Sequence, residues 1–175
     1  MERAGLMFSS RVLTNTLPVV LGILGAVIAN LPISILGGQV PAPLLALMPI
    51  YLWCLVRPDL MSPAWAFLIG VLEDILSNSP PGVWGASFVL TYALIDRQRD
   101  AFAGLSGFGA ILGFATSALV ACATAYGIVT VYYWHFSPIA PIMSLLAMTV
   151  IFYVPVAAIL SFVHRKLVGP LRSDF

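Results

Sequence analysis

Two adjacent carboxylates, Glu73 and Asp74, stand in the otherwise apolar stretch GVLEDILSNSPPGVWG. Acidic groups are costly to bury, so buried carboxylates often serve as proton relays, as ligand sites or as general acids and bases. Neighbouring residues on a helix point about 100° apart, however, which is poor geometry for a carboxylate dyad. Asp74 instead shares its helix face with three small or polar residues at a spacing of three or four, namely Gly70, Ser77 and Asn78. We expect this stripe to face protein.

Asp74 is well placed to hold together the turn that follows it. An acid at a helix C-terminus opposes the helix dipole, so it needs a compensating partner. We expect Ser79 to cap the next helix with Pro80 at its first position, and Gly82 to help make the turn abrupt. The unpaired N–H groups at the start of that helix would then donate hydrogen bonds to Asp74. Structural pinning is the preferred interpretation, while a proton-relay or ligand role and a contact with a partner protein stay open.

The other side chains that could take part in catalysis or metal binding have no suitably spaced partner residues in the sequence. Asn30 lies in the first apolar run, where we expect it to hydrogen-bond to another helix. His135 follows tyrosine and tryptophan residues typical of an interfacial aromatic belt, and His164 adjoins basic residues that would meet lipid headgroups. Cys54 and Cys122 lie within apolar runs without metal-binding spacing, so we expect buried thiols. The sequence therefore predicts no catalytic residue, no metal site and no cofactor.

The composition identifies the solvent that surrounds the protein. Of its 175 residues, 61% are hydrophobic and only 9% are charged, whereas soluble domains carry about a quarter charged residues. There is too little polar material to cover a globule in water. We therefore expect residues 1–175 to form a single integral membrane domain in contact with membrane lipids. A net charge of +1 without a basic stripe predicts no nucleic-acid partner.

Six apolar stretches predict an all-α, polytopic bundle of membrane helices. They cover about residues 13–35, 44–56, 63–76, 83–95, 105–132 and 139–163. The second to fourth stretches would rise only about 20 Å, short of a hydrocarbon core of about 30 Å. Either these short helices extend through their proline-containing flanks, or the third and fourth form a re-entrant pair. In both cases this region should pack inside the bundle.

The basic residues predict the orientation of the chain. All eight lysines and arginines fall before the first stretch, after the last, or in alternate connections between them. Cytoplasmic segments of membrane proteins carry an excess of such residues. The sequence therefore predicts that both termini face the cytoplasm.

Small residues recur at a spacing of four in two of the predicted helices. The pairs are Gly109 with Gly113, Gly22 with Ala26, and Gly25 with Ala29. Such spacing lets helices approach closely. The sequence leaves open whether either set serves internal packing, self-association or contact with a partner.

The run from RPD through PAWAFLIGVLEDILSNSPPGVWGASFVLTYALI resembles the rod shape-determining protein family MreD. The resemblance consists of a proline-containing loop, a helix that ends in G-x-x-x-D at Gly70 and Asp74, and a short polar turn over residues 77–82 before another short helix. The specific pattern covers about residues 57–95, and elsewhere the likeness is one of layout. Two features depart from the family pattern. Glu73 stands where an uncharged residue is expected, and a double proline fills the turn where a single apolar residue before the glycine is more usual.

This resemblance implies a non-enzymatic adaptor of the bacterial inner membrane that maintains cell shape. It implies binding to the bitopic protein MreC and, through that complex, a link to the actin-like MreB filament. RodA and a transpeptidase would be indirect partners during peptidoglycan synthesis. The family is also said to be similar in fold to the substrate-binding S-components of energy-coupling-factor transporters.

The residues themselves favour a non-enzyme, because the connections are too short for a catalytic domain and contain no nucleotide or nucleophile motif. An alternative is a small-molecule-binding or transport subunit, in which Glu73, Asp74, Asn78 and Asn30 would line a central cavity. An intramembrane hydrolase would need a second deep acid opposite Asp74. The sequence does not provide one, since the other aspartates before the C-terminal tail lie at helix ends.

Overall fold

The computed structural model describes residues 2–31, 41–103 and 108–167. Within these ranges all regular structure is helical, which confirms the predicted all-α class. The helices are α1 (Glu2–Ala29), α2 (Leu47–Val56), α3 (Pro63–Leu76), α4 (Val83–Arg97), α5 (Arg99–Ala103), α6 (Phe108–Tyr133) and α7 (Ile139–Leu167).

Local sequence signals explain most of the helix boundaries. α3 begins at Pro63, where proline is favoured as the first helical residue, and it covers the predicted residues. The first helix ends at Ala29 instead of continuing to residue 35, because Leu31 precedes a proline and is biased away from the helical conformation. α2 begins at Leu47 instead of residue 44, since the residues before it form turns. The short helix α5 was not predicted.

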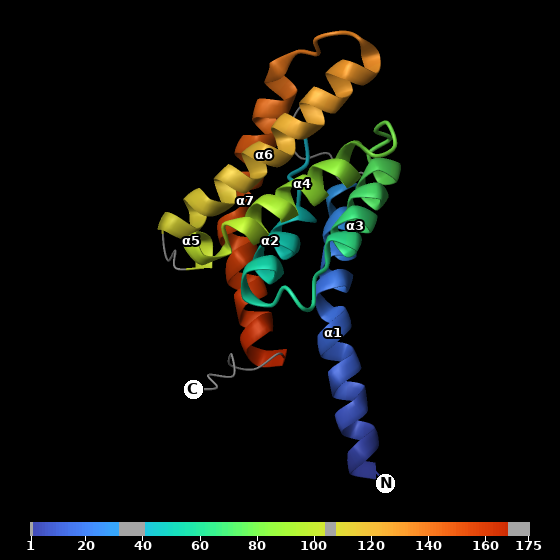
Figure 1. The fold of residues 1–175 in the computed structure, drawn as a ribbon, viewed down its shortest axis with the longest axis vertical. Coiled ribbons are helices and arrows are strands. Elements are labelled where there is room, and N and C mark those ends of the chain that lie inside the picture. The colour runs from blue at the N-terminus through green and yellow to red at the C-terminus, as the bar shows by residue number, and fades with distance from the viewer. Residues whose placement is uncertain (1, 32–40, 104–107, 168–175) are drawn as a thin grey trace.

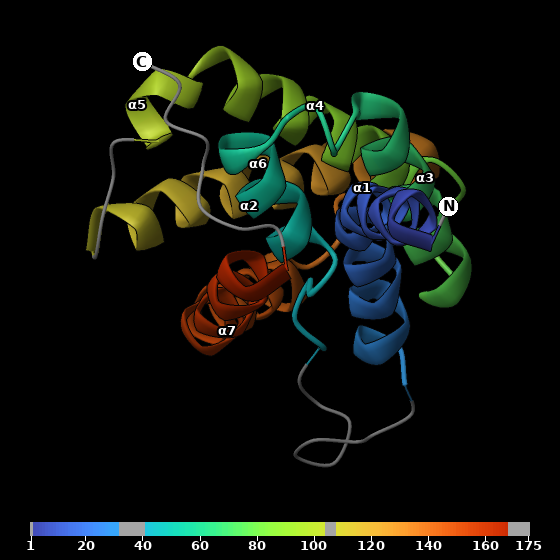
Figure 2. The same ribbon diagram turned by 90° about the horizontal axis from the view of Figure 1, so that it is seen from below.

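α2 occupies the centre of the molecule. Seven of its ten residues are buried, as expected for a helix that is apolar on all sides. It lies between α1 and α7 (Figure 2) and also contacts α4 and α6. Of the short segments predicted to pack inside the molecule, α2 does so, whereas α3 exposes Trp65, Phe67 and Leu68. α3 and α4 form an antiparallel pair beside α2, and α6 and α7 form a longer hairpin that projects beyond the α3–α4 turn (Figure 1).

Among the described residues, two helices are long and apolar enough to cross a membrane, namely Phe108–Tyr133 and Ile139–Val163. The 26 residues of α6 rise about 39 Å, which exceeds a hydrocarbon core of about 30 Å. The apolar helices Thr16–Ala29 and Leu47–Val56 are shorter. These features weakly indicate association with a membrane.

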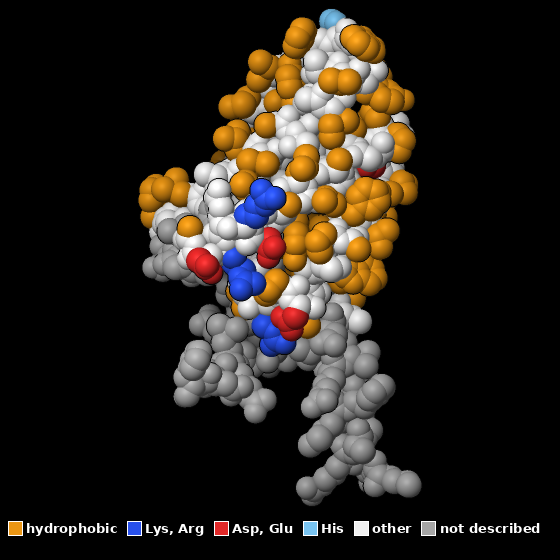
Figure 3. Space-filling view, in the orientation of Figure 1, with side chains coloured by type: hydrophobic (Ala, Val, Ile, Leu, Met, Phe, Trp, Pro, Cys, Tyr) orange, Lys and Arg blue, Asp and Glu red, His pale blue; other side chains and the backbone are white. Residues whose placement is uncertain are grey.

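The exposed charged side chains that the structure describes gather in one region of the face shown in Figure 3. In Figure 3 they lie over the α2–α3 connection and around α4 and α5, while apolar side chains cover the face beyond them. The start of α1 and the end of α7 lie toward the same end of the molecule (Figure 1). Within this region Arg57 and Asp59 form an ion pair at 3.0 Å. That contact lowers the pKa of Asp59 and raises that of Arg57, because each charge stabilises the other.

An aromatic cluster holds α7 against the core. The rings of Phe114 and Tyr153 stack with centroids 4.0 Å apart, and Tyr51 of α2 meets both edge-on. All three residues are buried. Because they come from α2, α6 and α7, the cluster joins the central helix to the long hairpin.

Candidate functional site

The carboxylate of Asp74 accepts hydrogen bonds from three backbone N–H groups at the start of α4. Gly82 and Gly85 donate to Oδ2 at 2.9 and 3.3 Å, and Trp84 donates to Oδ1 at 2.8 Å. Asp74 is buried, so these bonds replace the water that the charge has lost. The predicted hydrogen bonds from the following helix are therefore confirmed, and both oxygens of the carboxylate are occupied.

The expected role of Ser79 as the cap of α4 is wrong. α4 begins at Val83, and the residue that caps it is Gly82, which has no side chain to offer. Ser79 lies three residues earlier, and its hydroxyl pairs instead with that of Ser77 at 2.8 Å. The acceptor that a capping side chain would supply comes from Asp74 on the preceding helix, because the turn brings that carboxylate over the first N–H groups of α4.

Asn78 and Gly82 give the turn its shape through backbone conformation. Asn78 has φ of 56° and Gly82 has φ of 93°, both in the left-handed region that asparagine and glycine tolerate. The N–H of Ser79 donates to the Asp74 carbonyl at 3.0 Å, five residues back, as in a Schellman motif with Asn78 at the left-handed position. Ser77 and Asn78 are exposed. The predicted protein-facing stripe is therefore wrong for these two residues, because the helix has ended there.

Gly70 lets the backbones of α3 and α4 touch one turn before Asp74. A Cβ atom added at Gly70 would lie 2.5 Å from the Trp84 carbonyl oxygen and 2.7 Å from the nitrogen and Cα of Gly85. Across the contact, a Cβ at Gly85 would meet side chains of α3 at 3.1 Å. The G-x-x-x-D spacing thus combines a close backbone approach with a carboxylate placed to bond the adjacent helix start.

Glu73 bonds in a different direction, toward α1. The side-chain amide of Asn30, just past the end of α1, donates to Glu73 Oε1 at 2.8 Å and to the Ala26 carbonyl at 2.9 Å. This confirms the predicted hydrogen bond from Asn30 to another helix. Glu73 is 4% exposed, and its Oε2 has no hydrogen-bond partner among the described residues. Because Glu73 and Asp74 serve different helices, the two acids do not act as a dyad.

The small residues of α1 serve internal packing. A Cβ atom at Gly25 would lie 2.9 Å from the backbone of residues 45 and 46, and one at Gly22 would lie 2.6 Å from Ile69 of α3. In α6, Gly113 is buried and Gly109 is half-buried. The question that the sequence left open is therefore answered for α1, where the partner surface is within the chain.

Several tertiary hydrogen bonds carry no signal in the sequence. Thr149 Oγ1 of α7 accepts from the Leu44 N–H at 3.0 Å and donates to a carbonyl of its own helix. The hydroxyl of Tyr92 donates to the Met61 carbonyl at 2.7 Å, which ties the end of α4 to the α2–α3 connection. The participants in each bond are far apart along the chain, so only the fold reveals them.

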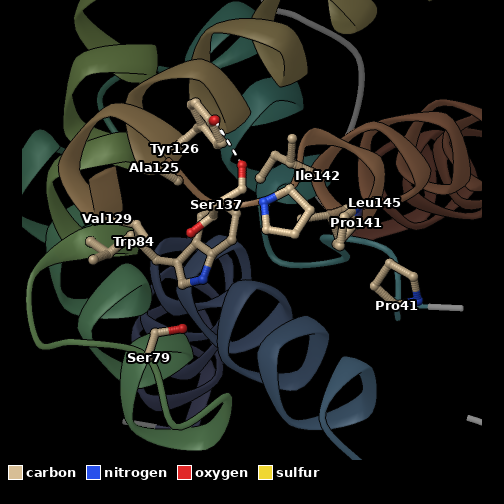
Figure 4. A pocket seen from close by; sticks show the side chains of 12 residues that line it. Pro41, Ser79, Trp84, Ala125, Tyr126, Val129, Ser137, Pro141, Ile142 and Leu145 are labelled. Atoms are coloured by element: carbon tan, nitrogen blue, oxygen red, sulfur yellow. Dashed lines mark hydrogen bonds between the residues drawn. The ribbon is translucent and has the colours of Figure 1, made fainter. Parts of the chain in front are cut away.

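Among the described parts of the chain, two cavities lie beside the α6–α7 hairpin, and neither is lined by the acidic pair or by the two asparagines. The larger, shown in Figure 4, has a volume of about 280 Å³. Within the described parts of the chain, no group of three His, Cys, Asp or Glu side chains could hold a metal ion. Cys54 and Cys122 are buried free thiols as predicted, His135 is exposed, and His164 lies outside the described side chains.

No protein-family model matches the chain, and no match is found among curated proteins or solved structures. The likeness to S-components of energy-coupling-factor transporters therefore stays a prediction.

Proposed function

We propose that this chain is a multi-pass adaptor of the bacterial inner membrane, of the MreD type, which binds a bitopic MreC-like protein. Through that partner it would link cytoskeletal filaments to peptidoglycan synthesis. The observation that carries the proposal is the α3–α4 pair, in which Gly70 permits backbone contact and Asp74 bonds three N–H groups of the next helix. These are the residues on which the resemblance to MreD rests.

The use of the acids is what an adaptor requires. Both carboxylate oxygens of Asp74 accept hydrogen bonds from backbone N–H groups at the start of α4, and Glu73 accepts one from Asn30 near the end of α1. Both bonds fix helices relative to one another, so the polar groups within the apolar region serve rigidity. The alternative of a small-molecule-binding subunit is not favoured, because Asn78 is exposed and none of the four residues proposed for its site lines either of the two cavities beside the α6–α7 hairpin.

The proposal includes six membrane segments with both termini in the cytoplasm. Arg57 belongs to the α2–α3 connection, which faces the end toward which α1 starts and α7 finishes (Figure 1). Arg97 and Arg99 lie at the end of α4 and the start of α5, at the side of the molecule and away from the α3–α4 turn. The α3–α4 turn and the α6–α7 connection, which carry no lysine or arginine, lie toward the other end. This arrangement agrees with the positive-inside rule.

Labelling of single cysteines tests the orientation. In a variant without Cys54 and Cys122, we expect a membrane-impermeant maleimide added outside spheroplasts to label a cysteine at Ser79 or Phe136. A cysteine at Asp59 or Gln98 should react only after the membrane is opened. Labelling of Asp59 from outside would contradict the proposed topology.

Purification with a tag from native membranes in mild detergent, followed by mass spectrometry, tests the adaptor role. We expect a single-span protein with a large periplasmic domain at a near-stoichiometric level. A chain recovered alone, or together with an ATPase module, would overturn the proposal and favour a transporter-like function.

A further inference from the structure

The tip of the α6–α7 hairpin carries an uninterrupted run of exposed rings. The run covers residues 132–136, and its members are Tyr132, Tyr133, Trp134, His135 and Phe136. Trp134 is 92% exposed. The hairpin projects beyond the α3–α4 turn (Figure 1), and in Figure 3 apolar side chains surround this end of the molecule, away from the charged region. The described parts of the chain therefore leave these rings uncovered.

Trp134 adopts a backbone conformation that does not suit a bulky residue. Its φ is 51°, in the left-handed region. At the α3–α4 turn the same region is occupied by Asn78 and Gly82, which tolerate it, whereas a large side chain is an outlier there. Such a conformation costs free energy, and strained residues cluster at functional sites. Because the exposed ring gains little packing within the described chain, the strain indicates a role for the ring outside it.

The turn that presents the rings is braced from within the hairpin. The hydroxyl of Tyr126, two turns before the end of α6, donates to the Ser137 carbonyl at 2.9 Å. The rings of Tyr132 and Tyr133 meet edge-on with centroids 4.9 Å apart. The position of the tip is therefore tied to α6, and whatever holds the rings also holds the hairpin.

The chemistry of the tip suits the boundary between lipid headgroups and hydrocarbon. Residues 101–163 contain no lysine, arginine, aspartate or glutamate, so the hairpin offers no charge to a charged partner. Tryptophan and tyrosine combine an apolar ring with one polar atom, and they are enriched at this boundary. The rise of α6, about 39 Å, lies between the thickness of the hydrocarbon core, about 30 Å, and that of the whole bilayer, about 40–45 Å. A tilted α6 therefore ends at the boundary.

We propose that the tip of the α6–α7 hairpin is a membrane anchor, in which Trp134 and the neighbouring rings lie at the headgroup boundary of the outer leaflet. The anchor fixes the depth of the two longest apolar helices. The inference rests on the proposed membrane placement but not on the adaptor role. The choice of leaflet follows from the proposed orientation, which the labelling of single cysteines tests.

Fluorescence quenching of the purified full chain in lipid vesicles measures the depth of Trp134. Trp53, Trp65 and Trp84 are replaced by phenylalanine, which leaves Trp134 as the single fluorophore. The vesicles contain phosphatidylcholine brominated either near the ester end or near the methyl end of its acyl chains. We expect several-fold stronger quenching of Trp134 by bromine near the ester end.

A second chain calibrates the depth. Leu119 is exposed in the middle of α6, so Leu119→Trp together with Trp134→Phe places the single fluorophore at the bilayer centre. This chain should show the reverse preference, with stronger quenching by bromine near the methyl end. No partner protein is present in these vesicles, so the result does not depend on the adaptor role.

Three outcomes would overturn the anchor. Trp134 that escapes both brominated lipids and is quenched by iodide in the water, while the Leu119→Trp chain is quenched in the bilayer centre, would place the tip in water or against a partner protein. Stronger quenching of Trp134 by bromine near the methyl end would place it in the hydrocarbon. If the Leu119→Trp chain also escapes both lipids, the membrane placement fails and the anchor fails with it.

A difference measurement avoids the buried tryptophans. If replacement of Trp53 and Trp84 prevents folding, as judged by gel filtration in detergent, wild type is compared with Trp134→Phe. The signal lost in Trp134→Phe should be the part that bromine near the ester end quenches. Trp134→Gly should also unfold at a higher temperature than Trp134→Ala, because both remove the ring and glycine adopts the left-handed conformation freely. Equal midpoints would overturn the strained conformation on which the proposal depends.

Discussion

The carboxylate of Asp74, near the end of α3, accepts a hydrogen bond from the N–H of Trp84, in the first turn of α4, at 2.8 Å. The two residues are ten positions apart, and the turn between them contains two left-handed residues. One helix thus caps its successor, which fixes the angle and register of the pair without a capping side chain on α4 itself.

Asp74→Ala should strongly destabilise the protein. Three N–H groups at the start of α4 would lose their acceptor, at a cost of about 1 kcal/mol or more for each buried donor. Thermal unfolding of the detergent-solubilised chain should show a lower midpoint, and less folded protein should accumulate in membranes. Asp59→Ala, at an exposed aspartate, is the control. A wild-type midpoint in Asp74→Ala, with intact assembly of the complex, would contradict the pinning role.

Gly70→Ala should also be destabilising, for steric reasons. The new Cβ would lie 2.5 Å from the Trp84 carbonyl oxygen, and backbone atoms cannot move aside without separating α3 from α4. Overpacking of this kind typically costs about 1–3 kcal/mol. Gly127→Ala is the matched control, because an added Cβ there meets nothing within 4 Å and alanine favours the helix. Equal unfolding midpoints for the two variants would show that α3 and α4 do not pack this closely.

Glu73→Gln should preserve or raise stability. The glutamine oxygen can accept from the Asn30 amide as Glu73 Oε1 does, and a neutral amide costs less to bury than a carboxylate. Asn30→Asp should instead lower the unfolding midpoint, because two acidic groups would then face each other without a donor between them. Asn78→Asp, the same change at an exposed turn residue, controls for the added charge. A large loss of stability in Glu73→Gln would indicate that the charge itself is required.

Thr149→Val should weaken the attachment of α7. Valine has nearly the same shape but cannot accept the hydrogen bond from the Leu44 N–H, and a buried donor left unpaired costs about 1–3 kcal/mol. Thr116→Val is the matched control, since that hydroxyl bonds only a carbonyl of its own helix and the residue is exposed. Limited proteolysis before α2 and the unfolding midpoint should distinguish the two variants.

The Arg57–Asp59 pair should make a small contribution that depends on pH. Because the pKa of Asp59 is lowered in the folded protein, its stabilisation is present above the unfolded pKa and is lost as pH falls through the folded pKa. Exposed pairs contribute at most about 1 kcal/mol and are screened by salt. Unfolding midpoints of wild type and Asp59→Asn should therefore differ slightly at neutral pH and converge in acid or high salt.

The positions of helices could be predicted closely from the sequence where local start and stop signals were strong. α3 has the predicted bounds because Pro63 starts it and the polar turn ends it, and the bonds to Asp74 followed from the unpaired N–H groups at any helix start. Ser79 was misassigned because its type and position suit a cap as well as Gly82 does. Only the path of the chain through the double proline decides which residue precedes the first helical turn.

The sequence by itself determined that the protein is helical and apolar. It also predicted that Asp74 accepts hydrogen bonds from the start of the following helix, and that Asn30 forms a hydrogen bond with another helix. These conclusions depend on composition, on periodicity and on contacts between residues close along the chain. Tertiary structure alone decided that Asn30 meets Glu73, that Gly25 packs on residues 45 and 46, and that Trp84 lines a cavity. Such contacts arise from the packing of helices that are distant along the chain. Helical spacing specifies the face of a helix on which a residue lies, but not the surface of another helix against which that face packs.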